Sequence, residues 1–176
     1  MFAWQFALMQ AAAEKNGWTK VCFPYHLHLQ HTNHLSQFIS MQNHYSLLYR
    51  EEEREMNALC THTGVGLIPW GPLNAGRLSR PASAHNSTSR SESQGALSAV
   101  DQEIISRVEK LAEKKGWTMS QVALSWIGGK VSSPIVGFSS EKRIEEAIGV
   151  RGKELTEEEG RALEEPYVPR AIEGHS

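Results

Sequence analysis

The chain has 176 residues, of which 40% are hydrophobic and 22% charged, and its 18 basic and 20 acidic side chains give a formal net charge of −2. This composition is typical of a folded domain with its own core, and such balanced charge excludes the basic surface by which proteins hold nucleic acids or anionic membranes. Two cysteines are too few for a disulfide framework, and no run approaches the roughly 18 apolar residues of a membrane helix, so we expect a cytoplasmic protein.

Residues 1–17 predict an amphipathic helix rather than a signal peptide. Phe2, Phe6, Met9 and Ala13 recur at helical spacing, and Gly17 follows them as a left-handed cap. No basic residue precedes this apolar run, whereas a secretory signal begins with a charged segment. Because a domain rarely begins with a half-buried helix, we expect the chain to be truncated at its start.

Residues 21–37 interrupt the connection between this helix and the first strand, and they carry four histidines: His26, His28, His31 and His34. A zinc site is one interpretation, but no carboxylate or cysteine cluster supports it and the spacing fits neither a helical metalloprotease nor a zinc finger, so we assign no metal. A loop insertion is a second interpretation. We favour a translated intron, because the segment is in frame and its codons permit splice-donor, branch-point and acceptor sequences in the required order.

Beyond residue 37 the pattern alternates between strands and helices. Three short apolar runs predict strands, at residues 38–42, 64–70 and 133–137. Helical patterns separate and follow them, at residues 46–60, 101–115, 118–127 and 140–148 and after Thr156. A Ser-rich stretch without periodicity, residues 81–98, predicts a flexible surface loop. The alternation predicts the α/β class with parallel strands covered by helices, and the two open edges of such a sheet predict self-association.

Several helix boundaries carry recognisable caps. Asp101 is the expected N-cap of a helix that ends before Gly116. Thr118 with Gln121, and likewise Thr156 with Glu159, match the capping-box pattern, in which each side chain bonds the backbone amide of the other residue. The tail from Pro166 onward shows no regular pattern.

Ligand sites of parallel α/β folds lie at the carboxyl ends of the strands, and three clusters of candidate residues stand there. Gln42, with Asn43 and His44, ends the first strand. The Gln42 amide offers a donor and an acceptor to a carboxamide-bearing ligand, or alternatively caps the next turn.

Trp70 ends the second strand, and its indole offers a face on which a flat ring can stack. The alternative is a core tryptophan, one of five in the chain. In the loop that follows, Gly76 and the backbone amides of residues 73–77 can meet a diphosphate, with charge added by Arg77.

The third cluster runs from Gly137 to Arg143, at the start of a helix. Unpaired amides, the hydroxyls of Ser139 and Ser140, and the cations of Lys142 and Arg143 form an anion site there. A plain Ser N-cap with solvated charges is the alternative.

Long stretches of the chain resemble the C-terminal half of the aldo-keto reductase family, in particular its fungal aryl-alcohol-dehydrogenase-like members. The similar stretches cover most of the chain, at residues 1–20, 41–60, 64–81, 118–126, 134–150 and 163–169. The resemblance implies a (β/α)8 TIM barrel that binds NADPH and reduces a small-molecule aldehyde or ketone to the alcohol. Such a barrel takes about 250 residues, so we expect a partial barrel of the last three or so βα units.

The resemblance also implies which residues bind the cofactor. Gln42 would bond the nicotinamide carboxamide, and Trp70 would stack on the nicotinamide ring. The loop that follows would run along the diphosphate, with Gly71, Pro72, Leu73, Ala75 and Arg77. The residues around the adenosine 2′-phosphate and the adenine would be Gly137, Phe138, Ser139, Ser140, Arg143 and Glu146. Because Arg143 is basic, it favours NADPH over NADH.

The family's catalytic Asp, Tyr, Lys and His lie on early strands that have no counterpart in this sequence. Tyr45 does not match the catalytic position, so we name no catalytic residue. Loss of a placed proton donor costs about 10²–10⁴-fold in rate. We therefore expect the cofactor-binding half of an NADPH-dependent reductase, inactive by itself. The alternative is an inactive remnant or interaction module that retains some nucleotide binding.

Overall fold

The computed structural model describes residues 8–9, 11–12, 15–17, 39–87 and 95–173. The His-rich segment 21–37 lies outside these residues, as does most of the predicted first helix. Gly17, which is described, has a φ of 64°, as a left-handed cap requires. None of the helices in the described ranges is both long and apolar enough to cross a membrane.

Three parallel segments form the centre of the fold. β1 (Ser40–Met41) pairs with β2 (Gly66–Leu67), with Ser40 opposite Gly66. Beyond these short strands the pairing continues as single parallel bridges, from His44 to Trp70 and from Trp70 to Ile135. The three predicted strands are therefore confirmed as neighbouring parallel segments, with residues 66–70 in the middle, although the regular pairing is shorter than predicted. Gly64 is not part of the second strand, because it is the left-handed cap of the preceding helix.

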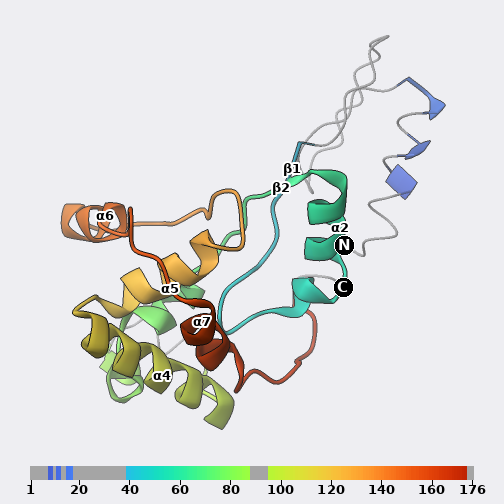
Figure 1. The fold of residues 1–176 in the computed structure, drawn as a ribbon. Helices are drawn as coiled ribbons and strands as arrows, with labels where there is room; N and C mark the ends of the chain where they lie inside the picture. Colours follow the sequence, from blue (N-terminus) through green and yellow to red (C-terminus); the bar gives the residue numbers. More distant parts are fainter. Residues whose placement is uncertain (1–7, 10, 13–14, 18–38, 88–94, 174–176) are drawn as a thin grey trace.

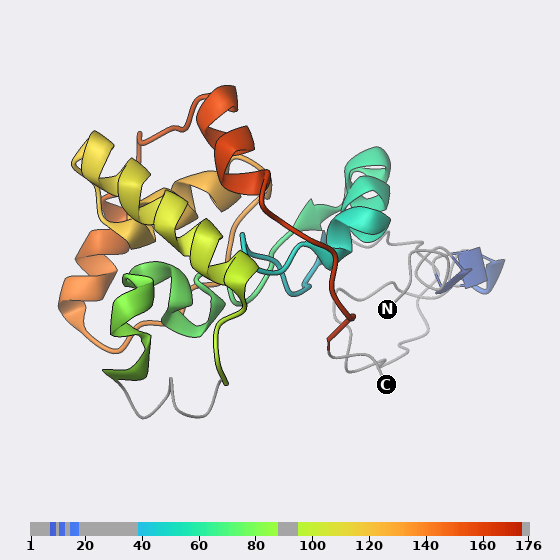
Figure 2. The same ribbon diagram turned by 90° about the horizontal axis from the view of Figure 1, so that it is seen from below.

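Residues 8–9 and 11–12 are helical, and five α-helices lie within residues 39–87 and 95–173: α2 (Met56–Thr63), α4 (Ala99–Lys115), α5 (Met119–Gly128), α6 (Glu141–Ile148) and α7 (Glu157–Glu164). Short 3-10 helices occur at η1 (Glu51–Arg54), η2 (Asn74–Ser79) and η3 (Ala82–Ser87). Helices α4, α5 and α7 lie together, whereas α2 lies apart from them beside β1 and β2 (Figures 1 and 2). The helices and the parallel segments together confirm the α/β class.

The local caps decide where most of these helices begin. Thr118 accepts the Gln121 amide and Thr156 accepts the Glu159 amide, so both predicted capping boxes are confirmed. Gly116 ends α4 with a φ of 64°, also as predicted. The predicted N-cap of α4 is wrong: the cap is Ser98, whose hydroxyl accepts the Asp101 amide while the Asp101 carboxylate accepts the Ser98 amide.

The predicted helix over residues 46–60 is confirmed only for residues 56–60, which belong to α2, and is wrong before them. Ser46 and Tyr49 exchange backbone hydrogen bonds of 3.0 and 3.1 Å, which closes a tight turn. The chain then forms η1, breaks at Glu55, and begins α2 only at Met56. The predicted loop over residues 81–98 contains η3 at one end and the Ser98 cap at the other, and residues 88–94 lie outside the described ranges.

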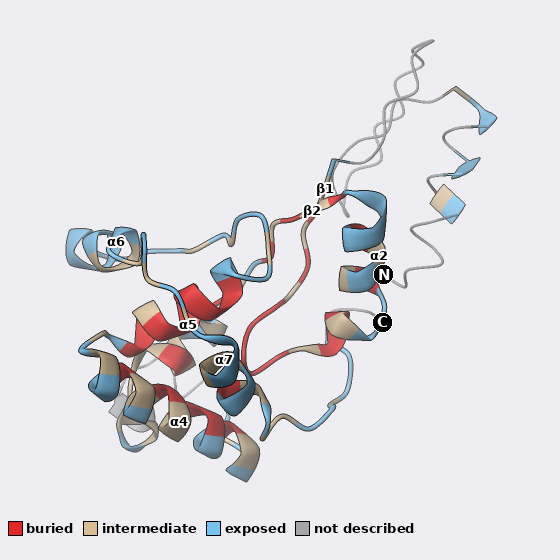
Figure 3. Ribbon diagram, viewed as in Figure 1, coloured by how far each residue is buried: buried red, intermediate tan, exposed pale blue. Residues whose placement is uncertain are grey.

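Two clusters of buried side chains explain this break. Leu47 and Leu48 of the tight turn belong to the main core, which is built on α4, α5 and α7. Met56 and Cys60 of α2 belong to a smaller core with Met41, Val65 and Leu67. The buried residues concentrate along α5 and the inner side of α4, whereas α6 is largely exposed (Figure 3). One continuous helix could not supply both cores.

The two faces of the parallel segments differ in burial. Side chains alternate between the faces of a strand. On one face Met41, Asn43 and Leu67 are buried, whereas Gln42 on the other face is only half-buried and Trp70 is 47% exposed. Parallel sheets are ordinarily covered on both faces. Within the described residues, helices cover only one.

Candidate functional site

The carboxyl ends of the three parallel segments bring the predicted clusters to one edge of the sheet. The Trp70 amide donates to the Asn43 carbonyl at 2.8 Å, and the Ile135 amide donates to the Pro69 carbonyl at 2.8 Å. Gln42 lies two positions before His44, which is the bridge partner of Trp70, and Gly137 lies two positions after Ile135. The sequence clusters therefore stand at the ends of adjacent segments, as ligand-binding residues of parallel folds do.

Trp70 is not a core tryptophan. Its indole lies parallel to the imidazole of His44, with ring centroids 4.1 Å apart and planes 9° apart. The imidazole covers one side of the indole, yet Trp70 remains 47% exposed. A flat ligand can therefore reach the indole of Trp70.

His44 itself is enclosed. Its other face stacks on Tyr49, with centroids 4.2 Å apart and planes 12° apart, and its side chain is 11% exposed. Burial, together with the positive charge of Arg170, lowers the pKa of His44 to about 4. The Glu173 carboxylate lies 3.8 Å from Nδ1 but does not reverse this shift, because it is 63% exposed and solvent screens its charge. His44 is therefore a neutral ring at physiological pH.

The sequence placed His44 beside Gln42 but did not predict this three-ring stack. Tyr49 carries no local signal of the stack, because its position depends on the tight turn that it closes with Ser46. The stack is the part of the site that sequence reasoning missed.

The loop after Trp70 adopts left-handed backbone. Gly71, Asn74, Ala75 and Gly76 have φ values of 70°, 45°, 53° and 92°. Left-handed conformation costs an L-residue roughly 1–2 kcal/mol, and such strain concentrates at functional sites. The amides of Asn74 and Gly76 donate to carbonyls within the loop, at 2.9 and 3.0 Å, so these two of the amides proposed for a diphosphate already have partners.

The remaining loop residues fix the position of the loop. Pro72 is buried and Leu73 packs against the main core. Ala75 is exposed. The Arg77 guanidinium donates to the Gly95 carbonyl at 3.1 Å, which ties the loop to the approach to α4.

The third cluster surrounds the N-terminus of α6 and is exposed to solvent. Nη1 of Arg143 donates to Oγ of Ser139 at 3.1 Å. Ser140 is the N-cap, but its side chain makes no capping hydrogen bond, which argues against a plain Ser cap. A guanidinium, two hydroxyls and the helix amides therefore gather at one exposed point, an arrangement suited to a phosphate.

The flanking residues of this cluster are accessible or half-buried. Gly137 is exposed and Phe138 is 41% exposed. Glu146 is half-buried, and its backbone carbonyl accepts a hydrogen bond of 3.1 Å from the Gln121 side chain, which fixes α6 against α5.

Tyr45 is not available as a proton donor to a ligand. It is 2% exposed, and its hydroxyl donates to the Glu53 carboxylate, which also binds Arg50 at 2.7 Å. Burial and then the bond to Glu53 raise the pKa of Tyr45 far above its usual value. Tyr45 is a structural residue.

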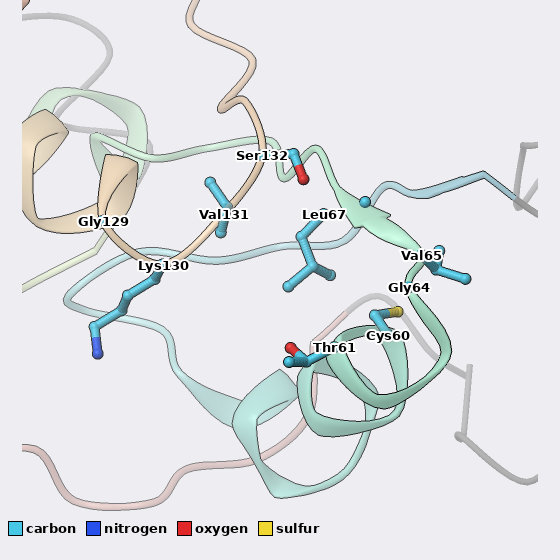
Figure 4. Close-up of a pocket in the computed structure, with 10 residues that line it drawn as sticks. Cys60, Thr61, Gly64, Val65, Leu67, Gly129, Lys130, Val131 and Ser132 are labelled. Carbon is cyan, nitrogen blue, oxygen red and sulfur yellow. The ribbon is translucent and has the colours of Figure 1, made fainter.

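A pocket of about 360 Å³ lies at the opposite end of β2, between α2 and the segment after α5 (Figure 4). Leu67, Val65 and Val131 contribute its apolar wall. The Thr61 hydroxyl is bonded to the Asn57 carbonyl, and the Lys130 ammonium is paired with Glu164 at 2.8 Å. Because these two polar groups are engaged and the pocket lies away from the carboxyl ends of the segments, we do not place the functional site there.

Comparisons with known proteins identify the family of this chain. A model of the Aldo/keto reductase family matches residues 21–167. An aldo-keto reductase from Fusarium vanettenii is 48% identical over 182 residues, which cover 100% of this chain and 45% of the relative. A putative aryl-alcohol dehydrogenase from Schizosaccharomyces pombe is 42% identical over 179 residues, covering 99% of this chain and 46% of the relative.

A solved structure shows the same fold. The glycerol dehydrogenase from Gluconobacter oxydans superposes with a TM-score of 0.63 at 20% identity, over 81% of this chain and 47% of that chain. The chain thus spans about half the length of the relatives it matches. Because the family match extends over most of its residues, the chain belongs to the aldo/keto reductase family.

Proposed function

We propose that this chain binds NADP(H) across the carboxyl ends of its three parallel segments, as the cofactor-binding part of an enzyme that reduces aldehydes or ketones to alcohols. We also propose that these segments belong to a partial (β/α)8 barrel. The observation that carries the proposal is the accessible indole of Trp70, with the half-buried Gln42 near the end of the adjacent segment.

Each cluster suits one part of the dinucleotide. The Gln42 amide can both donate to and accept from a carboxamide, and the Trp70 indole can stack on a nicotinamide ring. The left-handed loop from Gly71 to Arg77 would follow the diphosphate. The Arg143 guanidinium and the hydroxyls of Ser139 and Ser140 would hold a 2′-phosphate, which NADPH carries and NADH lacks. When bound, NADPH supplies the hydride for the reduction.

The described tyrosines do not supply a proton to a carbonyl substrate. The hydroxyl of Tyr45 donates to Glu53 and that of Tyr167 donates to Glu51, whereas Tyr49 is only 1% exposed. A general acid contributes roughly 10²–10⁴-fold to such a reaction. We therefore expect binding of NADPH without efficient turnover from this chain alone. The aldo-keto reductases it resembles are about twice as long.

Calorimetric titration with NADPH and NADH tests the proposal. We expect NADPH to bind more tightly than NADH, and Arg143→Ala to remove this preference. Arg151→Ala is the matched control, because Arg151 is an exposed arginine just beyond α6. Absence of NADPH binding, or an unchanged preference in Arg143→Ala, would contradict the proposal. Oxidation of NADPH with an aromatic aldehyde, followed by nicotinamide absorbance, separates an active enzyme from the inactive alternative.

Two further expectations stay predictions. The exposed Ile39 and Ile135, at 76% and 45%, lie on the outer segments of the sheet, so we expect self-association at high protein concentration. We also expect the protein to reside in the cytoplasm.

A further inference from the structure

Three aromatic rings form a continuous stack that ends at the exposed indole of Trp70. Tyr49, His44 and Trp70 come from a tight turn, the end of one parallel segment and the end of its neighbour. Their ring planes differ by 12° and 9°, and their centroids are 4.2 and 4.1 Å apart. The middle ring is buried at 11% side-chain exposure, whereas the last ring, Trp70, is 47% exposed.

The imidazole is held tightly between its neighbours. A Cβ atom at Gly71 would lie 3.1 Å from Cδ2 and 3.2 Å from Nε2 of His44, so the backbone of Gly71 confines the ring edge. From the other side, the Glu173 amide donates to the Tyr49 hydroxyl at 2.9 Å, which fixes the ring that backs His44. Within the described residues, the buried Nδ1 of His44 has no hydrogen-bond partner. The ring is therefore placed by packing and stacking, since no hydrogen bond orients it through Nδ1.

We propose that His44 is a positioning residue, which fixes the plane of the Trp70 indole so that its open face is ready for the nicotinamide ring. This inference rests on the proposed function. A half-exposed tryptophan without a backing ring samples several rotamers, and a ligand that stacks on it must first restrict them. A stacked imidazole restricts them beforehand. His44 does not touch the ligand in this arrangement, because it lies on the covered side of the indole.

The first test uses the ligand-free protein and reports on the stack alone. Quenching of tryptophan fluorescence by acrylamide is measured for each protein and for its Trp70→Ala version, and the difference gives the signal of Trp70. We expect His44→Ala to raise the accessibility of Trp70, and His44→Phe, which keeps a flat ring, to leave it near the wild-type value. The matched control is His62→Ala, because His62 is exposed on α2. Equal quenching in His44→Ala and the wild type would overturn the inference.

The second test measures NADPH affinity by calorimetry in a double-mutant cycle. Because a stacked aromatic pair stabilises the position of the Trp70 indole, we expect His44→Ala to weaken NADPH binding about two- to tenfold. We expect His44→Phe to restore the affinity for NADPH and His62→Ala to leave it unchanged. In the Trp70→Ala background the effect of His44→Ala should disappear, because the two residues act through one interaction. Urea denaturation of each variant confirms that it is folded.

The outcomes distinguish this inference from the proposed function. If the wild type binds NADPH and Trp70→Ala weakens binding, but His44→Ala does not, the positioning role is overturned and the proposed function stands. The positioning role is likewise overturned if His44→Ala weakens binding by an equal factor in both backgrounds. If the wild type does not bind NADPH, the proposed function is overturned and the assignment falls with it, while the quenching data still decide whether the stack exists.

Discussion

The hydroxyl of Tyr167 donates a hydrogen bond of 2.7 Å to the carboxylate of Glu51, which lies 116 positions earlier in the chain. The same hydroxyl accepts the backbone amide of Arg50 at 2.9 Å. Glu51 is 5% exposed, and it also accepts the backbone amide of Arg170 at 2.8 Å. These hydrogen bonds link Tyr167 and Arg170, near the end of the described chain, to Arg50 and Glu51, which directly follow Tyr49 of the stack.

Removing the Tyr167 hydroxyl should therefore destabilise the fold. Tyr167→Phe leaves the Arg50 amide without its partner and takes one donor from a buried carboxylate, which costs about 1–3 kcal/mol of unfolding free energy. Urea denaturation followed by circular dichroism gives this value. Glu113→Gln, at an exposed position of α4, is the control and should change the unfolding free energy by less than about 0.5 kcal/mol. A urea midpoint of Tyr167→Phe equal to that of the wild type would show that the hydrogen bonds of Tyr167 do not stabilise the fold.

The burial of His44 predicts a specific dependence of stability on pH. An ordinary histidine has a pKa near 6.5, whereas that of His44 is lowered to about 4. As the pH falls below 6.5 the unfolded chain takes up a proton that the folded chain refuses, so stability is lost between pH 6.5 and about pH 4. The loss attributable to this residue is about 2–3 kcal/mol.

Urea denaturation at a series of pH values from neutral to about pH 4 measures that loss, and His44→Gln should flatten the curve in this window. His62→Gln serves as the control, because His62 is an exposed histidine on α2. Parallel pH curves for the wild type and His44→Gln would contradict the prediction.

Substitution of Gly71 by alanine tests whether steric contact with His44 adds to the cost of backbone strain. Its φ is 70°, and a Cβ atom there would press on the His44 ring. Gly71→Ala should therefore cost more unfolding free energy than Gly152→Ala, which has a φ of 81° but no atom within 4 Å of the added Cβ. We expect Gly152→Ala to lower the unfolding free energy by about 1–2 kcal/mol, and Gly71→Ala to lower it by at least about 1 kcal/mol more. Equal losses at the two positions would mean that His44 moves aside without cost.

The thiol of Cys60 should be unreactive in the folded protein. Its side chain is fully buried, and burial, followed by the nearby negative charge of Glu52, raises the pKa of the thiol to about 11. Because the thiolate is the reactive form, a Cys22→Ser variant should react with a disulfide reagent at about pH 8 more than about 100-fold more slowly in buffer than in urea. Comparable rates under the two conditions would show that Cys60 is accessible.

Local features of the fold could be predicted from the sequence, and features set by distant contacts could not. The capping boxes at Thr118 and Thr156 are decided within four residues, so the sequence was sufficient for them. The parallel direction of the segments also followed from alternation alone. The helix predicted over residues 46–60 failed because Leu48 and Leu59, which would lie on the same side of an ideal helix, pack against different cores.

The same distinction between local features and distant contacts applies to the candidate site. The sequence clusters around Gln42, Trp70 and Ser139 follow the ends of neighbouring segments, as strand order requires. The backing of Trp70 by His44 and Tyr49 depends on a tight turn and on an amide 124 positions further along the chain, at Glu173. No pattern in a short window of sequence contains that information.

The attachment of the tail also constrains when this protein can acquire its shape during synthesis. The Tyr49 hydroxyl needs the Glu173 amide, and Arg50 needs Glu164, so the final contacts join the first described third of the molecule to its last residues. These contacts can therefore close only after residue 173 has been synthesised. Until then the nascent polypeptide exposes apolar strand surface, and such long-range closure is slow. We therefore expect the contacts around the His44 stack to form late in folding.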